Sequence, residues 1–269
     1  MASADQFIIT CPSNSSMELY PNNKVAHFKI RLNKPIELIG DYEVGLSQIQ
    51  YPMSWNNIRR NRNGFSVRYE RKPLTLDAVG KSTKRLYRIA PGYYSDISKV
   101  VHEMKTLLTQ PKLNKLGIDI QYNDATRRVT INTKQSERHG EKLKSIKLKN
   151  DVAMLLGFKN DRLIKPNREV TSTFLALPSS GFHHMYVYCD VVQETAVGDV
   201  QAPLLRVLPA KMQSNELMID TAFANVHYIP VARKQFSELE FKITDDVGNL
   251  VGFQQGKIVI VLHFRRKNV

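Results

Sequence analysis

VAHFKIRL, residues 25–32, alternates apolar and polar side chains: every second residue from Ala26 to Leu32 is apolar, and the three residues between are polar. Successive side chains of a β-strand point to opposite faces, so this period of two predicts a strand with one buried face. YEVGLSQIQY, residues 42–51, repeats the alternation and stops at Pro52. The first part of the chain therefore predicts β-structure and no helix.

The same signature returns in the last third of the chain. Its apolar runs are MYVYCDVV (185–192), PLLRVLP (203–209), LMI (217–219), NVHYIPV (225–231), LEFKI (239–243) and KIVIVLHF (257–264). One more such run, FIITC (7–11), lies near the start of the chain. About three strands thus precede residue 59, and five or six follow residue 165. Roughly eight antiparallel strands with turn residues between them predict a sandwich, and eight is the number of strands in a jelly roll.

The middle of the chain has a different period. The apolar residues Ile97, Val100, Val101, Met104, Leu107 and Leu108 form a helical stripe, with Ser95 placed as its cap. A hairpin is expected at 118–131 and a short helix at 150–157, capped by Asn150 and ended by Gly157. The predicted fold is mainly β: an antiparallel eight-stranded single jelly roll (1–58 and 166–269) with an inserted small α+β domain (59–165).

Positive charge is concentrated in that middle segment. The chain has a net charge of +14, whereas residues 59–165 carry 25 Lys and Arg against 10 Asp and Glu, a net of +15. Two interpretations stay open: a solvated basic face, or a surface that binds a polyanion such as nucleic acid or an anionic cell surface. The candidate contacts are Arg127, Arg128, Lys142, Lys144, Lys147 and Lys149.

Catalytic and cofactor motifs are missing from the sequence, so no enzyme activity and no cofactor are predicted. Neither a glycine-rich phosphate loop nor a nucleophile elbow occurs. His183, His184 and Cys189 lack the further ligands of a tetrahedral metal site, and the run DDVGN at 245–249 is expected to be a tight turn. An enzyme on a jelly roll remains an alternative, and it would need a metal-ligand set such as His27, His227 and His263.

The chain carries two cysteines, Cys11 and Cys189, both in apolar runs, and we expect buried free thiols made in a reducing compartment, the cytoplasm or nucleus. The longest aliphatic run near the end, residues 258–262, is far shorter than the roughly 20 residues that span a bilayer. The first residues lack the basic start and apolar stretch of a secretory signal. Neither a membrane span nor secretion is predicted.

Short blocks along the whole chain, in order, point to a known group of proteins. These blocks are CPSNSS (11–16), YPNN (20–23), YEVGL (42–46), QYP (50–52) with Trp55, PGYY (91–94), LLGF (155–158), YVYCD (186–190), VGDVQAPLLR (197–206) and LHFRR (262–266). Together they resemble the penton, or minor capsid, proteins of Polinton/Maverick elements and their adintovirus and virophage relatives. No single block is specific, but their succession is.

The resemblance implies a structural capsid protein of the virion, a single jelly roll that forms homopentamers at the five-fold vertices of an icosahedral capsid. It also implies a double-jelly-roll major capsid protein as partner. The positive charge of residues 59–165, and not the resemblance, suggests packaged DNA or an anionic cell surface as a further contact. The alternative function is a basic nucleic-acid- or polyanion-binding module on a β scaffold, for which charge is the argument.

A subunit interface is expected in the segment 193–205, which we interpret as a loop. Its apolar residues Val197, Val200, Pro203 and Leu204 lie outside any strand face that the sequence defines. Apolar residues at the centre of a contact are typical of durable interfaces.

Overall fold

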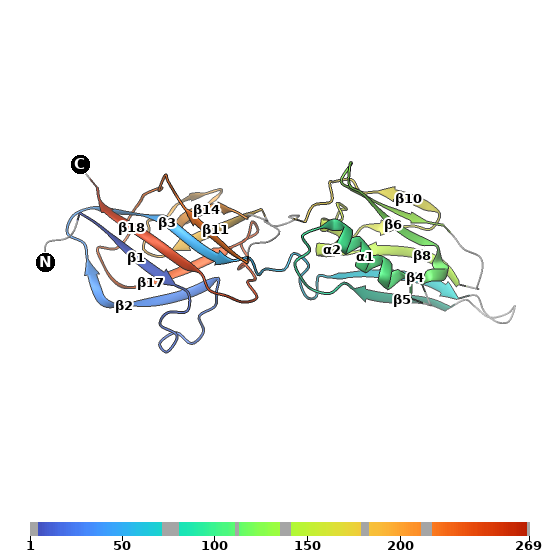
Figure 1. Ribbon diagram of the computed structural model, residues 1–269, viewed down its shortest axis with the longest axis horizontal. Coiled ribbons are helices and arrows are strands. Elements are labelled where there is room, and N and C mark those ends of the chain that lie inside the picture. Colours follow the sequence, from blue (N-terminus) through green and yellow to red (C-terminus); the bar gives the residue numbers. More distant parts are fainter. Residues whose placement is uncertain are drawn as a thin grey trace. The chain divides into compact units, whose positions relative to one another are not determined.

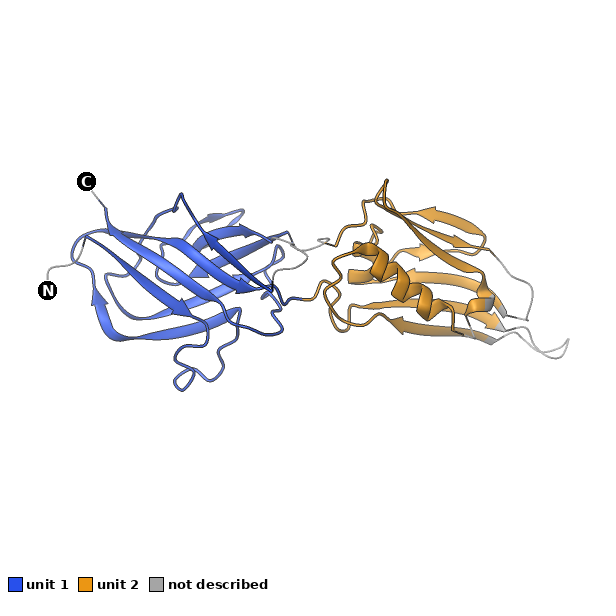
Figure 2. Cartoon of the chain, in the orientation of Figure 1, with its two compact units in different colours: residues 1–55, 182–269 blue, residues 56–181 orange. Residues whose placement is uncertain are grey.

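The computed structural model of the chain describes residues 5–71, 81–110, 113–134, 141–178, 183–210 and 217–267. The chain forms two compact units, unit 1 from residues 1–55 and 182–269, and unit 2 from residues 56–181 (Figure 2). The inserted domain expected from the sequence ends at residue 165. Unit 2 runs further because β10 (Arg168–Thr171) pairs with β7 (Arg128–Thr133) and Ala176 is buried in the core of the unit.

Unit 1 contains two large antiparallel sheets and a separate two-stranded hairpin (Figure 1). Its longer strands are β1 (Gln6–Pro12), β2 (His27–Glu37), β3 (Tyr42–Pro52), β11 (His184–Cys189), β14 (Leu204–Pro209), β15 (Met218–Ala222), β17 (Gln235–Thr244) and β18 (Val259–Arg266), and its short strands are β12 (Thr195–Val197), β13 (Val200–Ala202) and β16 (Ile229–Pro230). One sheet has the order β1-β18-β3-β15, with β16 pairing the start of β3, and the other has the order β14-β11-β17-β2. These two strand orders, with the eight longer strands divided equally between two sheets, are those of a jelly roll, and they confirm the predicted fold class.

Aromatic side chains fill the core of unit 1. Phe264 on β18 stacks on Phe7 of β1, with ring centroids 4.8 Å apart, and on Phe236 of β17 at 5.8 Å. Phe28 of β2 stacks on Phe241 of β17 at 5.1 Å. Since Phe236 belongs to one sheet and Phe264 to the other, these contacts join the two layers.

The two cysteines lie in this core as free thiols, as the sequence predicts. Burial raises the pKa of the Cys11 thiol to about 12, and it raises the pKa of Cys189 well above its usual value. Both side chains are therefore protonated at neutral pH and behave as small apolar residues.

Unit 2 combines two sheets with helices (Figure 1). One sheet has the order β5-β4-β8-β9, from β4 (Gly64–Arg71), β5 (Lys81–Arg88), β8 (Glu141–Leu148) and β9 (Leu163–Ile164); the other has the order β10-β7-β6, with β6 (Ile118–Asn123). The helices are α1 (Ile97–Leu108), the 3-10 turn η1 (Asn114–Leu116) and α2 (Asn150–Leu155). A single apolar cluster contains residues of α1, α2 and both sheets, so the unit has its own core.

Both helices begin differently from the prediction, although their positions are correct. Asp96 caps α1, because its carboxylate accepts a hydrogen bond from the backbone N–H of Ser98 at 2.7 Å; Ser95 does not. At α2 the cap residue is Lys149 and Asn150 is already helical, its backbone N–H donating to the side chain of Asn160 at 2.7 Å. In the part of the chain that the structure describes, no helix is long and apolar enough to cross a membrane.

A buried carboxylate on α2 holds the first residues of unit 2 against that helix. Asp151, only 4% exposed, accepts hydrogen bonds from the guanidinium groups of Arg59, at 3.0 and 3.1 Å, and Arg62, at 2.7 Å. Burial by itself raises the pKa of Asp151, but the hydrogen bonds from the two arginines outweigh it and leave the pKa below its ordinary value of 3.8. The ionised form therefore stabilises the folded state.

Gly45 in the middle of β3 provides a first test of the packing of unit 1. A Cβ atom there would lie 2.4 Å from the Val226 side chain and 2.5 Å from the carbonyl oxygen of His227. We expect Gly45→Ala to lower the free energy of unfolding by about 1–3 kcal/mol, because the backbone at 226–227 must move. The fluorescence of Trp55, the one tryptophan in the sequence and a residue of unit 1, follows this unfolding in urea. Gly252→Ala is the control, since nothing lies within 4 Å of its added Cβ; equal losses would contradict the account.

Asp151 provides the corresponding test in unit 2. Asp151→Asn keeps the shape but removes the charge, and we expect it to lower the free energy of unfolding by about 2 kcal/mol. The loss is full above the ordinary carboxyl pKa and disappears as the pH falls through the lowered pKa, because protonated aspartic acid cannot make the pair either. Helical circular dichroism reports this unfolding, since the described helices α1 and α2 both lie in unit 2.

Asp119→Asn is the matched control for this variant, because it lies in the same unit. Asp119 and Lys105 form an ion pair of 3.8 Å in which both side chains are about half exposed. Solvent screens such a pair, so its loss costs less than about 0.5 kcal/mol. A pH-independent effect of Asp151→Asn would show that the charge of Asp151 is not what holds the segment.

Candidate functional site

The predicted interface segment is a β-hairpin and not the loop expected from the sequence. Strands β12 and β13 pair so that Val197 lies opposite Val200, and Gly198 in the turn has a φ of +63°. Such a backbone favours glycine, which explains the Gly198-Asp199 pair at the tip. Val200 is 56% exposed, and nothing lies within 4 Å of a Cβ built on Gly198. The tip of the hairpin projects away from neighbouring side chains.

Pro203 and Leu204 lie at the base of this hairpin, where it joins β14. The carbonyl of Pro203 accepts a hydrogen bond from the backbone N–H of Cys189 at 3.0 Å, and Leu204 pairs with Tyr188. Both side chains are half-buried. The structure thus divides the four predicted interface residues between an exposed tip and a base attached to the edge strand β14 of one sheet.

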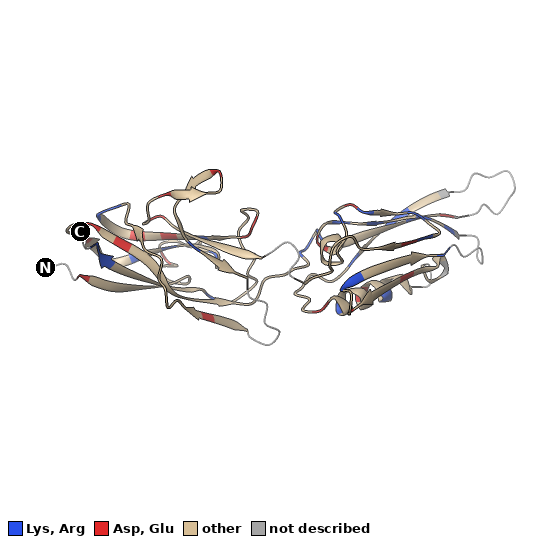
Figure 3. Ribbon diagram, turned by 90° about the horizontal axis from the view of Figure 1, so that it is seen from above, with Lys and Arg blue, Asp and Glu red and all other residues tan. Residues whose placement is uncertain are grey.

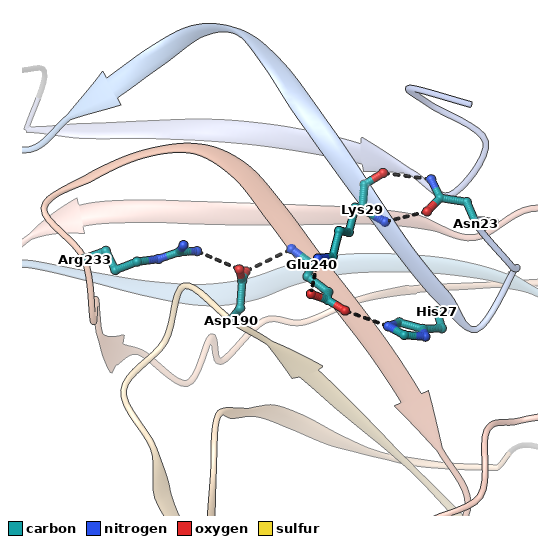
Figure 4. Close-up of polar contacts among 6 residues, drawn as sticks. All are labelled: Asn23, His27, Lys29, Asp190, Arg233 and Glu240. Atoms are coloured by element: carbon teal, nitrogen blue, oxygen red, sulfur yellow. Dashed lines mark hydrogen bonds and ion pairs between the residues drawn. The ribbon is translucent and has the colours of Figure 1, made fainter. Parts of the chain in front are cut away.

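Residues quoted in the resemblance form polar contacts that fix loops of unit 1 (Figure 4). The side-chain oxygen of Asn23 accepts from the backbone N–H of Lys29 at 2.9 Å, and its amide donates to the Lys29 carbonyl at 2.8 Å. Ser13 makes a similar pair with Ile258: its backbone N–H donates at 2.8 Å and its hydroxyl accepts at 2.9 Å. The blocks CPSNSS and YPNN therefore contain residues that hold their loop against strands of the jelly roll.

Glu240 and Asp190 form the centre of the polar cluster drawn in Figure 4. Glu240 on β17 contacts His27 at 2.7 Å and the ammonium of Lys29 at 2.9 Å. Burial alone raises the pKa of Glu240, but these two partners outweigh it and lower the pKa. Asp190 accepts from the Glu240 backbone N–H at 2.9 Å and from Arg233 at 2.7 Å. The cluster joins β2, β17 and the end of β11, so its role is structural.

The histidines considered as metal ligands are held in separate places. His27 contacts Glu240, and the ring of His263 makes a 2.7 Å hydrogen bond with the Tyr228 hydroxyl. Asp246 accepts hydrogen bonds from the backbone N–H groups of His183, at 2.6 Å, and His184, at 3.3 Å. Within the described residues, no group of three or more His, Cys, Asp and Glu side chains could hold a metal ion.

Asp245 forms the expected tight turn. Its carboxylate accepts from the backbone N–H groups of Val247, at 3.0 Å, and Asn249, at 2.9 Å. These contacts occupy the carboxylate within the turn itself, which agrees with the sequence interpretation of DDVGN.

The six predicted polyanion contacts do not share one face. Arg127 lies in the turn between β6 and β7, and Arg128 donates to the carbonyls of Ser172 at 2.5 Å and Thr173 at 2.8 Å, so both belong to the three-stranded sheet. Lys142, Lys144 and Lys147 lie on β8 of the four-stranded sheet, and Lys149 follows that strand. Figure 3 shows Lys and Arg along the strands of unit 2. The prediction thus combined residues of two separate sheets.

Asn23 tests whether the resemblance blocks hold the fold. We expect Asn23→Ala to lower the free energy of unfolding of unit 1 by about 2 kcal/mol, because two hydrogen bonds to Lys29 are lost. Urea unfolding followed by Trp55 fluorescence measures it. The neighbouring exposed residue provides the control Asn22→Ala, which should change stability by less than about 0.5 kcal/mol. Equal stability of the two variants would mean that the block serves another purpose.

Comparison with known proteins finds similarity among solved structures. No family model matches the sequence, and no curated protein matches it. Among solved structures, the crystal structure of the selenomethionine-labelled mavirus penton protein matches with a TM-score of 0.50. The match covers 97% of this chain and 99% of that chain at 13% sequence identity, a level at which the likeness concerns the fold. The chain therefore has the fold of the mavirus penton protein along nearly its whole length.

Proposed function

We propose that this chain is a penton subunit of a viral capsid, assembling as a homopentamer at the five-fold vertices. The observation that carries the proposal is the architecture as a whole: a jelly roll with a second compact unit inserted between β3 and β11, similar over nearly the full length of both chains to a penton protein. The order of the resemblance blocks in the sequence supports the same conclusion independently of the fold.

The proposed role is structural, and it works through buried surface. In a five-membered ring each contact is heterologous: one patch of a subunit meets a different patch of its neighbour, and the rotation closes the ring. A stable contact of this kind buries about 1,000 Å² or more, with apolar residues at its centre. Around the ring, the partner is another copy of this chain, and outside it the double-jelly-roll major capsid protein.

The hairpin β12–β13 and the edge strand β14 are the candidate ring contact. Val200 at the tip and Val207 on β14 are exposed apolar residues, at 56% and 39%. The base of the hairpin is fixed, because the Gln193 N–H donates to the Pro230 carbonyl at 2.9 Å and Val192 pairs with Val231. An exposed hairpin that carries valines, beside a strand that lies at the end of its sheet in the described part of the chain, suits insertion into a neighbouring subunit.

The native mass of the purified protein tests the proposal. Light scattering on a sizing column should give about 154 kDa, five times the 30.8 kDa of one chain. A stable dimer or trimer would contradict the proposal, because neither fits a five-fold vertex. If the chain elutes as a monomer, the same measurement is made after co-expression with the major capsid protein, where a persisting monomer counts against the ring.

Substitutions on the hairpin test the contact itself. We expect Val200→Asp to convert the pentamer into a folded monomer. The substitution places a charge at the centre of the contact. It does not disturb the fold of the monomer, because the position is already exposed there. Leu204→Asp should do the same at the base. Val247→Asp is the control, since Val247 is 74% exposed on the turn after β17. An unchanged elution volume for both hairpin variants would remove the assignment.

A further inference from the structure

One face of the four-stranded sheet of unit 2 is basic and open to solvent. Phe65, Val67 and Tyr69 on β4 are buried in the core of the unit, so the alternate residues of the strand lie on the opposite, outer face. The outer residues of β4 include Arg68, which is exposed. On the neighbouring strand β5, the exposed residue Leu86 lies over Gly64, since its Cδ1 would be 3.0 Å from a Cβ built there.

Six cationic side chains share this outer face across three adjacent strands. They are Arg68 on β4, Lys84 and Arg88 on β5, and Lys142, Lys144 and Lys147 on β8. The strand registers place Arg68 directly opposite Lys84, Glu70 opposite Lys142, and Ser66 opposite Lys147. Neighbouring strands are about 4.8 Å apart, so the cations form a compact field.

Acidic partners balance only part of this charge. Lys144 pairs with Glu70 at 2.5 Å, and Lys147 pairs with Asp161 at 3.1 Å. Arg68, Lys84, Arg88 and Lys142 form no ion pair with another described residue. Like charges directly opposite each other in a sheet are destabilising, so the Arg68–Lys84 pair weakens the unit when nothing is bound.

We propose that this face binds a linear sulfated polysaccharide. Closely spaced sulfate and carboxylate groups along a narrow chain match cations that are spread over three strands, roughly 10 Å across. The exposed leucines Leu86 and Leu163, 46% and 50% exposed, lie on the same face and offer apolar contact to sugar rings. The described outer residues of β4, β5, β8 and β9 include no aromatic side chain, so the stacking platform typical of single-stranded nucleic-acid binding is missing there.

The face differs from the set of contacts that the sequence suggested. It excludes Arg127 and Arg128, which lie on the other sheet, and it adds Arg68, Lys84 and Arg88. The shared members are Lys142, Lys144 and Lys147, because β8 directs these three side chains outward.

Two triple variants with the same change in charge test the proposal. The face variant is Arg68→Ser, Lys84→Ser and Lys142→Ser. The control variant is Arg127→Ser, Lys99→Ser and Lys105→Ser, all exposed cations of unit 2 outside this face. A heparin dodecasaccharide is titrated into each full-length protein by calorimetry at several salt concentrations, and a DNA duplex and a single-stranded DNA of matched charge are titrated in parallel.

We expect the face variant to bind heparin at least about tenfold more weakly than the unchanged protein, with a salt dependence that is less steep by about two to three charges. The control should stay within about twofold. The thermal midpoint of the face variant should equal or exceed that of the unchanged protein, because the Arg68–Lys84 repulsion is gone. This excludes misfolding as the cause of weaker binding.

Three results would overturn the proposal. Equal losses in the two triple variants would mean that net charge, and not this face, attracts heparin. Unchanged heparin binding by the face variant would place the ligand elsewhere. Tighter binding of either DNA than of heparin, lost in the face variant, would assign the face to nucleic acid instead. None of these affinities or thermal midpoints depends on the oligomeric state, so the test is independent of the penton proposal.

Discussion

The pairing of β18 between β1 and β3 is the contact on which unit 1 depends. Phe264 of this last strand stacks on Phe7 of the first strand and on Phe236 in the opposite sheet. Strand β1, near the start of the chain, and β18, near its end, must therefore pair before their sheet is complete. The entropic cost of closing a connection grows only slowly with its length, so a whole compact unit can stand between β3 and β11.

The sequence was sufficient for elements in which one face is apolar and the other polar throughout. The alternation at 25–32 and 42–51 corresponds to β2 and β3, and the apolar stripe at 97–108 corresponds to α1. The strand β8 was missed because a register shift at Arg68/Tyr69 interrupts the period of two, leaving Leu143 and Ile146 three residues apart. The strand β4 was missed although Phe65, Val67 and Tyr69 alternate with Ser66 and Arg68 in the sequence.

Functional surfaces were harder to predict than strands, because a surface is made by registers that pair distant residues. Arg68 and Lys84 become neighbours only when β4 pairs with β5, and their spacing in the sequence does not predict this pairing. Conversely, Arg127 and Arg128 are close in sequence to the basic strand β8 but lie on another sheet. The resemblance blocks show a related effect, since Asn23 and Asp190 belong to these blocks and hold loops and strands of the fold.

The central claim is that the jelly roll serves as a vertex subunit, and electron cryomicroscopy of particles assembled from this chain and the major capsid protein tests it most directly. The account predicts that density for five copies of unit 1 appears around each five-fold axis and at no other symmetry position. Density for this chain at two-fold or three-fold positions, or only inside the particle against the packaged DNA, would contradict it.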